Sequence, residues 1–174
     1  MVISAPAVET KRLRLRPLVA DDVEALHRIQ SDPEHMRFYP QPFSMQESVA
    51  WIQRAIEHYA KHGFGLLAVE DRTTGEFLGN VGPTMQRVDD VDEIELGWSI
   101  TPSRARQGIA TEAATGCRDW VFEVVGADHV ISLILPENEP SAGVARKLGM
   151  TVWKQTLHGS VQWLHDVWRV GHGG

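Results

Sequence analysis

Residues 94–112 read IELGWSITPSRARQGIATE, and this stretch decides the fold that the chain is expected to adopt. Its first part, residues 94–100, has the short pattern of a strand. A turn follows, and a long helix is expected to begin near Ile109. The small residues Gly108 and Ala110 allow a ligand to approach the backbone there. Because the first turn of a helix presents unpaired N–H groups and the positive end of the dipole, this helix start predicts an anion site.

Two arginines, Arg104 and Arg106, add positive charge beside the helix start. The loop lacks the Gly-Lys-Ser/Thr of a P-loop and the Gly-x-Gly-x-x-Gly of a dinucleotide-binding fold. Taken alone, a glycine-containing loop before a helix is also compatible with an ordinary strand-to-helix turn. Its meaning therefore depends on what the rest of the chain places beside it.

A second informative segment, LPENEPSAGVARKLGM, occupies residues 135–150. It follows a short apolar run at residues 129–135, which predicts a strand buried beside a parallel neighbour. Asn138 and Ser141 lie three positions apart, at the expected start of a helix over residues 141–148. Their side chains either cap free N–H groups at that helix start or face a cleft at the carboxyl end of the preceding strand. Both interpretations stay open.

The remaining patterns predict strands that alternate with helices. A capping box at Asp21 and another at Ser44 each indicate a helix start. Between these two helices, residues 32–43 form a loop rich in proline and aromatic residues, which we expect to pack over the core or a ligand. Further elements are a strand at residues 11–17, strands at 64–70 and 77–84, a turn at 88–92, a helix at 109–125, and strands at 150–157 and 162–170.

The composition narrows the classes of protein. A chain of 174 residues suits one domain, expected at residues 9–170 between a loose terminus at 1–8 and a tail at 171–174. It has no secretory signal and no apolar run of the roughly 20 residues that a membrane helix needs, so a cytoplasmic location is expected. The net charge of −6 argues against a nucleic-acid partner. The single cysteine, Cys117, is expected in the core, and the histidines lack the spacing of a metal site.

Together, the two segments resemble the GNAT superfamily of N-acetyltransferases, and within it the ribosomal-protein-alanine (RimJ/RimL-type) branch. The similarity spans about residues 9–170 and implies an α+β fold. Its central sheet is mixed and mostly antiparallel, with a splayed parallel strand pair and flanking helices. The motifs that carry the resemblance are GIATEA at 108–113, PEN before Ser141, LGM at 148–150, ETKRLRLRP at 9–17, DPE at 32–34 and ELGW at 95–98.

The resemblance implies that acetyl-CoA is the co-substrate and that no metal takes part. The pantetheine arm would pair with the backbone of residues 98–100, between the splayed strands, and the pyrophosphate would lie on the N–H groups of residues 106–111. The cofactor-binding residues implied are Trp98, Ser99, Ile100, Arg104, Arg106, Gln107, Gly108, Ile109, Ala110, Thr111, Asn138, Ser141 and Arg146.

The chain departs from the family pattern at three positions. Ala105 stands where the pyrophosphate motif often has Arg, Gln or an aromatic residue, and Ala145 stands where many members have a tyrosine acid. Some relatives in the ribosomal branch carry a glutamate base in the final hairpin, but no carboxylate lies between residues 154 and 165.

The expected reaction is transfer of an acetyl group to a primary amine by direct attack in a ternary complex. The catalytic candidates are Ser141, Glu95 and Asn138, with Ser141 as the acid for the departing thiolate. Glu95 is the first candidate for the base because acidic neighbours can raise its pKa, and His158 is the second.

The acceptor stays open among a protein N-terminus, an antibiotic amine, a polyamine and an amino acid. Two other functions also remain: a sensor that binds acyl-CoA without turnover, and a scaffold that binds another phosphate ligand. A homodimer is compatible with such a fold.

Overall fold

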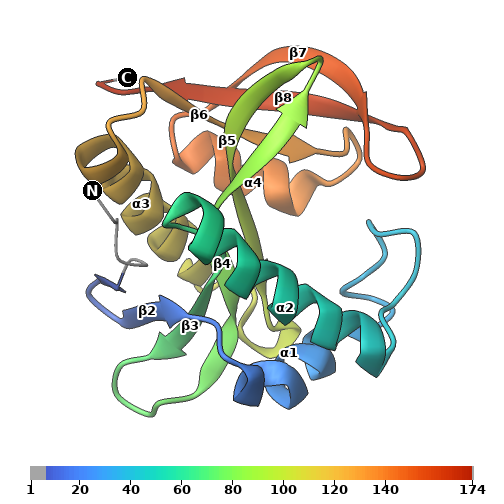
Figure 1. Ribbon diagram of the computed structural model, residues 1–174, viewed down its shortest axis with the longest axis vertical. Coiled ribbons are helices and arrows are strands. Elements are labelled where there is room, and N and C mark those ends of the chain that lie inside the picture. The colour runs from blue at the N-terminus through green and yellow to red at the C-terminus, as the bar shows by residue number, and fades with distance from the viewer. Residues whose placement is uncertain (1–6, 174) are drawn as a thin grey trace.

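A computed structural model describes residues 7–173 and places a mixed sheet of eight strands at the centre of the molecule (Figure 1). The strand order is β1-β2-β3-β4-β5-β6-β8-β7, and β5 and β6 are parallel whereas their neighbours pair antiparallel. The expected α+β fold with a mostly antiparallel sheet is therefore confirmed. The strands are β1 (Val8–Glu9), β2 (Leu13–Pro17), β3 (Leu67–Asp71), β4 (Phe77–Val88), β5 (Val91–Ile100), β6 (His129–Ile134), β7 (Thr151–His158) and β8 (Trp163–Gly171).

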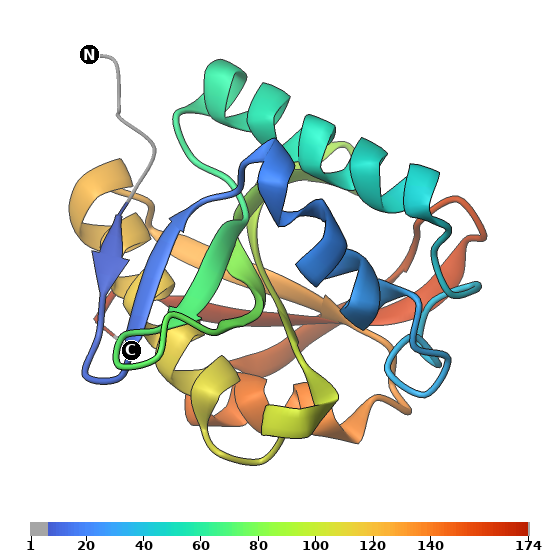
Figure 2. The same ribbon diagram turned by 90° about the horizontal axis from the view of Figure 1, so that it is seen from below.

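Helices cover both faces of this sheet. Figure 2 shows α1 (Val23–Gln30) and α2 (Met45–His62) on one face, and α3 (Ile109–Trp120) and α4 (Glu139–Lys147) on the other. Short helical turns at Ala20–Asp22 and Pro102–Arg104 precede α1 and α3. The predicted helix over residues 109–125 changes character at its end, because Val121–Val125 forms a π-helical turn.

The two predicted capping boxes have different outcomes. At α2 the Ser44 hydroxyl accepts from the N–H of Glu47, and the Glu47 carboxylate accepts from the N–H of Ser44 at 2.7 Å, so that prediction is confirmed. At α1 the predicted capping box at Asp21 is wrong, because the N-cap residue is Asp22 and its side chain makes no capping hydrogen bond to the helix. The carboxylate of Asp22 accepts from the N–H of Val19 at 2.9 Å and is held by Arg16 at 2.8 Å, which fixes the turn there.

Residues near both limits of the described chain take part in the sheet. Residues 1–6 lie outside the described part of the structure, but Val8 pairs with Leu15 and is buried. A Cβ atom at Gly116 would lie 3.0 Å from the Val8 side chain, so β1 rests directly against α3. At the other end, Gly171 pairs with His129 and extends β8 into the predicted tail.

The main hydrophobic core lies between the sheet and the helices α3 and α4. Leu96 of β5 packs there with Ala113 and Cys117 of α3, with Ala145 of α4, and with Leu148 directly after α4. Burial raises the pKa of the Cys117 thiol to about 12. The expectation that Cys117 is a core residue is confirmed.

On the opposite face, one side chain joins α2 to the start of α1 and to the sheet. The hydroxyl of Tyr59 accepts from the N–H of Leu18 at 2.9 Å and donates to the carbonyl of Leu66. Leu18 is almost fully buried, so its N–H has no access to water as a substitute partner.

Tyr59→Phe should lower the free energy of unfolding by about 1–3 kcal/mol, because it leaves a buried N–H and a carbonyl without a partner. Urea denaturation measures this change. Tyr39→Phe is the matched control, since the Tyr39 hydroxyl forms no hydrogen bond within residues 7–173. Equal free energies of unfolding for Tyr59→Phe and the control would contradict the stabilising role assigned to the Tyr59 hydroxyl.

Candidate functional site

The parallel strands β5 and β6 separate shortly after they meet. Their register contains one residue pair, Glu95 with Ile131. Beyond that point, residues 97–100 of β5 pair with β4 on one side, and no strand of the described chain pairs with them on the other. A backbone edge of this kind can bind an extended ligand in the manner of an added strand.

Two side chains occupy the point where the strands separate. The hydroxyl of Ser132 donates to the carbonyl of Leu96 at 2.8 Å, and the carboxylate of Glu95 accepts from the N–H of Leu133 at 3.4 Å. These bonds replace those that a continuous parallel ladder would supply. Glu95 therefore lies at the apex of the opening.

Strand alternation gives β5 two chemically different faces. Leu96 is buried against α3 and α4, with Trp98 and Ile100 partly buried against the same core. Glu95 and Ser99 point to the other face, where α1 and α2 lie. The backbone of residues 98–100 thus lies between an apolar side and a polar side.

Burial raises the pKa of Glu95, while contacts with the N–H of Leu133 and the side chains of Gln86 and Thr84 act against this shift. Burial, and secondly the charge of Glu95, raise the pKa of the Tyr39 phenol. Glu95 is therefore a carboxylate that takes up a proton more readily than an ordinary glutamate, as a general base acting near neutral pH requires.

The segment after β5 leads into the uncapped start of α3. Gly108 occupies the N-cap of α3 with φ of 75° and supplies no capping side chain. The first N–H groups of α3 are consequently free of an intrahelical or capping partner. A Cβ atom at Gly108 would meet only Arg12, at 3.6 Å, so the backbone is open to a ligand.

The two arginines of this loop differ in their surroundings. The guanidinium of Arg104 contacts Glu76 at 2.7 Å, Asp71 at 3.1 Å and Gln107 at 3.2 Å. The two carboxylates of the β3–β4 hairpin thus balance the charge of Arg104. Through these contacts Arg104 holds the loop after β5 against the hairpin. Arg106 is exposed, and its backbone has a φ of 61°. Of the two, Arg106 is the one whose charge faces solvent without a carboxylate partner in the described chain.

Asn138 caps α4, where its side-chain oxygen accepts from the N–H of Ser141 at 3.2 Å. The hydroxyl of the half-buried Ser141 has no hydrogen-bond partner among residues 7–173, so it is available to a ligand. Arg146 is exposed and pairs with Glu139 at 2.5 Å. The Asn138 side chain therefore caps α4, as one of the two interpretations predicted, and the Ser141 hydroxyl has no hydrogen-bond partner within residues 7–173.

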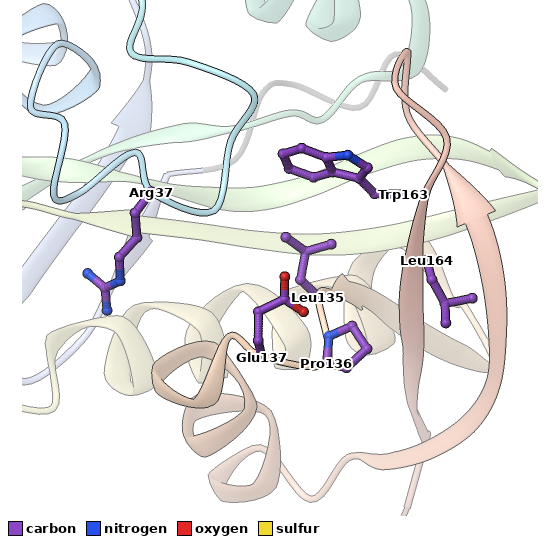
Figure 3. Close-up of a pocket in the computed structure, with 6 residues that line it drawn as sticks. All are labelled: Arg37, Leu135, Pro136, Glu137, Trp163 and Leu164. Atoms are coloured by element: carbon purple, nitrogen blue, oxygen red, sulfur yellow. The ribbon is translucent and has the colours of Figure 1, made fainter.

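The loop between α1 and α2 closes over β5. The imidazole of His35 forms a hydrogen bond of 2.8 Å with the hydroxyl of Ser99, and burial lowers the pKa of His35. The loop also borders a cavity of about 340 Å³ beside the end of β6. Figure 3 shows Arg37 of the loop on one side and Trp163 of β8 on the other; the lining residues are Arg37, Leu135, Pro136, Glu137, Trp163 and Leu164.

Several of these contacts were not predicted from the sequence. His35 and Ser132 reach β5 from elements far away in the chain, at Ser99 and Leu96 respectively. The aromatic composition of residues 32–43 was the one local signal that this loop covers a ligand or the core. Within residues 7–173, no group of three or more histidine, cysteine or acidic side chains is placed to hold a metal ion. None of the helices in that range has the length and apolar character to span a membrane.

Comparison with known proteins identifies relatives along most of the chain. The acetyltransferase (GNAT) domain model matches residues 12–151. YkkB of Bacillus subtilis (strain 168) is 31% identical over 142 residues, which are 81% of this chain and 83% of YkkB. The spermidine N(1)-acetyltransferase of Escherichia coli (strain K12) is 24% identical over 154 residues, which are 84% of this chain and 76% of that enzyme.

Solved structures share the architecture. An acetyltransferase from Agrobacterium tumefaciens superposes with a TM-score of 0.84 and 28% identity, covering 99% of this chain and 98% of its own. The RimL ribosomal-protein α-N-acetyltransferase, solved in complex with coenzyme A, superposes with a TM-score of 0.77 over 95% of this chain and 98% of its own. Its 15% identity makes this second likeness one of fold alone.

Glu95→Gln should change how stability depends on pH. Because the folded pKa of Glu95 is raised, its protonated form stabilises the fold, and this contribution is lost as the pH rises from the ordinary value of 4.5 through the raised pKa. The variant should therefore gain stability relative to the wild type as the pH rises above 4.5. Urea denaturation at several pH values measures the difference.

The matched control is Glu57→Gln, at an exposed position on α2, which should show no such trend. A stability difference for Glu95→Gln that stays constant over this pH range would contradict the assigned environment.

Proposed function

Because this chain belongs to the GNAT acetyltransferase family, an acetyl-CoA-dependent class of enzymes, we propose that it acetylates a primary amine by direct attack in a ternary complex. The observation that carries the proposal is the opening between β5 and β6, with Glu95 at its apex and the uncapped start of α3 close to its end. The motif at residues 136–141 favours the RimJ/RimL-type branch, and a cytoplasmic location is part of the same proposal.

The residues present fit acetyl-CoA along the length of the opening. The free edge of residues 98–100 accepts the pantetheine amides as an added strand. The N–H groups of residues 108–111 would donate hydrogen bonds to the pyrophosphate, because the N-cap glycine leaves the helix start uncovered. Arg106 adds exposed positive charge beside this site, while Arg104, which donates to the side chain of Gln107, keeps the loop in place. When bound, acetyl-CoA supplies the thioester carbonyl as the electrophile.

Glu95 acts as the general base in this proposal. An amine reaches the site as an ammonium ion and must lose a proton before it can attack. The buried carboxylate favours uptake of that proton, as its raised pKa indicates. Its bond to the N–H of Leu133 holds it at the point where the strands separate.

Ser141 donates a proton to the departing sulfur and is reprotonated through solvent. Its hydroxyl is free of internal partners, and Asn138 fixes the turn on which it lies through the bond to the N–H of Ser141. Asn138 is accordingly a positioning residue here. The vacant tyrosine position at Ala145 leaves Ser141 as the hydroxyl on α4 for this task.

The acceptor enters from the side of the α1–α2 loop in this proposal. A cavity of about 340 Å³ beside Arg37 and Trp163 borders this entrance. Among the relatives above, one is named for spermidine and one for a ribosomal protein, so both small and macromolecular amines are chemically compatible acceptors.

Release of free thiol from acetyl-CoA, measured with a panel of small amines and short peptides, tests the function. We expect amine-dependent release together with a mass gain of one acetyl group on the acceptor. Binding of coenzyme A without release in the presence of any amine would instead identify an acyl-CoA sensor. Failure of coenzyme A to raise the melting temperature would refute cofactor binding itself.

Ser141→Ala should lower kcat by about a hundredfold or more, as loss of a general acid does, while the affinity for coenzyme A stays nearly unchanged. Steady-state kinetics and calorimetric titration with coenzyme A measure the two effects separately. Ser160→Ala, at an exposed turn between β7 and β8, is the matched control. Unchanged kcat in Ser141→Ala would remove this hydroxyl from the mechanism.

A further inference from the structure

A second cavity lies between α2 and β4, on the face of the sheet that carries Glu95. Its volume is about 210 Å³. Helix α2 supplies one wall with Trp51, Arg54 and His58, and β4 supplies the other. The complete lining is Trp51, Arg54, Ala55, His58, Leu66, Thr84, Met85 and Gln86.

This cavity adjoins the apex of the β5–β6 opening. Thr84 is the cross-strand partner of Glu95, so the two side chains share a face of the sheet, and Gln86, two residues further along β4, lies on that face as well. Leu66, which also lines the cavity, lies 3.8 Å from the position of a Cβ atom on Gly97. The floor of the cavity and the proposed base therefore form one continuous surface.

Aromatic rings line the same surface from the side of the α1–α2 loop. The ring of Tyr39 lies 6.2 Å from that of Phe43, which in turn lies 5.7 Å from that of Trp51. The charge of Glu95 acts on the Tyr39 phenol. This row of rings thus runs from the neighbourhood of Glu95 to the wall that carries Arg54.

The two ends of this surface carry side chains of opposite charge. At one end is Glu95. At the other, the guanidinium of Arg54 lies 5.7 Å from the Trp51 ring centroid and forms no ion pair within residues 7–173. The indole N–H of Trp51 is buried and has no partner in the same range.

The other ionisable groups nearby are already engaged. His58 accepts from the N–H of Met85 at 2.9 Å through Nε2, and its Nδ1 lies 2.6 Å from the carbonyl of Phe64, a pattern that only the neutral ring satisfies. Glu93, on the same face of β5 as Glu95, pairs with His129 at 2.6 Å. Arg54 therefore remains the cation whose charge has no balance along this surface.

We propose that the cavity binds a carboxylate on the acceptor, held by Arg54, while the amino group of the same molecule faces Glu95. This assignment rests on the proposed acetyltransferase function and narrows its acceptor to a short amino acid. A guanidinium suits a carboxylate through paired, charge-assisted hydrogen bonds. A polyamine would instead bring a second ammonium group against Arg54, with no acidic residue among those that line the cavity.

The test compares three series of acceptors that differ in one terminal group. Amino acids from glycine to 4-aminobutyrate carry a carboxylate, the matching alkylamines carry a methyl group, and the matching diamines carry a second ammonium. We expect kcat/KM with acetyl-CoA to be highest for one member of the amino-acid series, by about tenfold or more over its alkylamine, and lowest for the diamines. Higher kcat/KM for diamines or spermidine than for every amino acid would overturn the proposal.

Arg54→Ala should lower kcat/KM for the preferred amino acid by about tenfold, mainly through KM, and change that for the alkylamine by less than about twofold. Arg54→Glu should shift the preference toward the diamine. Arg28→Ala, at an exposed arginine on α1, is the matched control and should leave all three series unchanged. An unchanged ratio of amino acid to alkylamine in both Arg54 variants would also overturn the proposal.

The result separates this proposal from the function on which it rests. If no acceptor releases thiol from acetyl-CoA although coenzyme A binds, the proposed activity fails. Calorimetric titration of the protein–coenzyme A complex with glycine, β-alanine and 4-aminobutyrate then tests whether the cavity binds a carboxylate. Binding that Arg54→Ala abolishes supports a carboxylate site, and absence of such binding overturns it.

Discussion

Two side-chain hydrogen bonds allow the sheet to open between β5 and β6. In a sheet interior, a carbonyl or N–H that loses its partner costs more free energy than an ordinary hydrogen bond contributes. Ser132 satisfies the carbonyl of Leu96, and Glu95 satisfies the N–H of Leu133, so the strands separate without that cost. The edge exposed beyond them, and hence the proposed site for the cofactor, depends on these two bonds.

The opening is supported at both of its ends. The tip of the β4–β5 hairpin reaches β7, where the carboxylate of Asp89 contacts Lys154 at 2.6 Å and Thr156 at 2.5 Å (Figure 1). At the other end, Arg104 joins the loop after β5 to the β3–β4 hairpin. Because β5 is fixed before and after the opening, its free edge keeps one geometry. Because side chains alternate along β5, Leu96 packs in the core on one face of the sheet and Glu95 lies on the other.

The sequence predicts the elements well where the signal is local. The alternation at residues 94–100 and the glycine at the start of α3 are properties of neighbouring residues, and both elements form as expected. The parallel pairing of β5 with β6 also follows, because the intervening helix crosses from one strand to the other. The start of α1 shifts by one residue, since Arg16 and Val19 hold Asp22 through contacts that helix propensity does not contain.

The arrangement of side chains in the site depends on distant contacts and could not be predicted in the same way. His35 and Ser99 are 64 positions apart, and Arg104 meets Asp71 across 33 positions. The contact between Arg104 and Asp71 leaves Arg106 as the arginine of this loop that faces solvent. The cavity at Arg54 requires α2 to lie along β4, and no periodicity in either element specifies this. The sequence thus predicts the backbone of the site, while the charges around it emerge from the folded chain.

The burial of Cys117 has a practical consequence for measurement. It is the chain's single cysteine. The hydrophobic core against which α3 packs buries it, and this burial raises the pKa of its thiol to about 12. Thiolate is the form that reacts with disulfide and maleimide reagents, so the folded protein presents almost no reactive sulfur of its own. A chromogenic thiol reagent can therefore follow liberated coenzyme A with little background from the protein. A cysteine introduced on the surface would be the unique attachment point for a fluorescent or spin label.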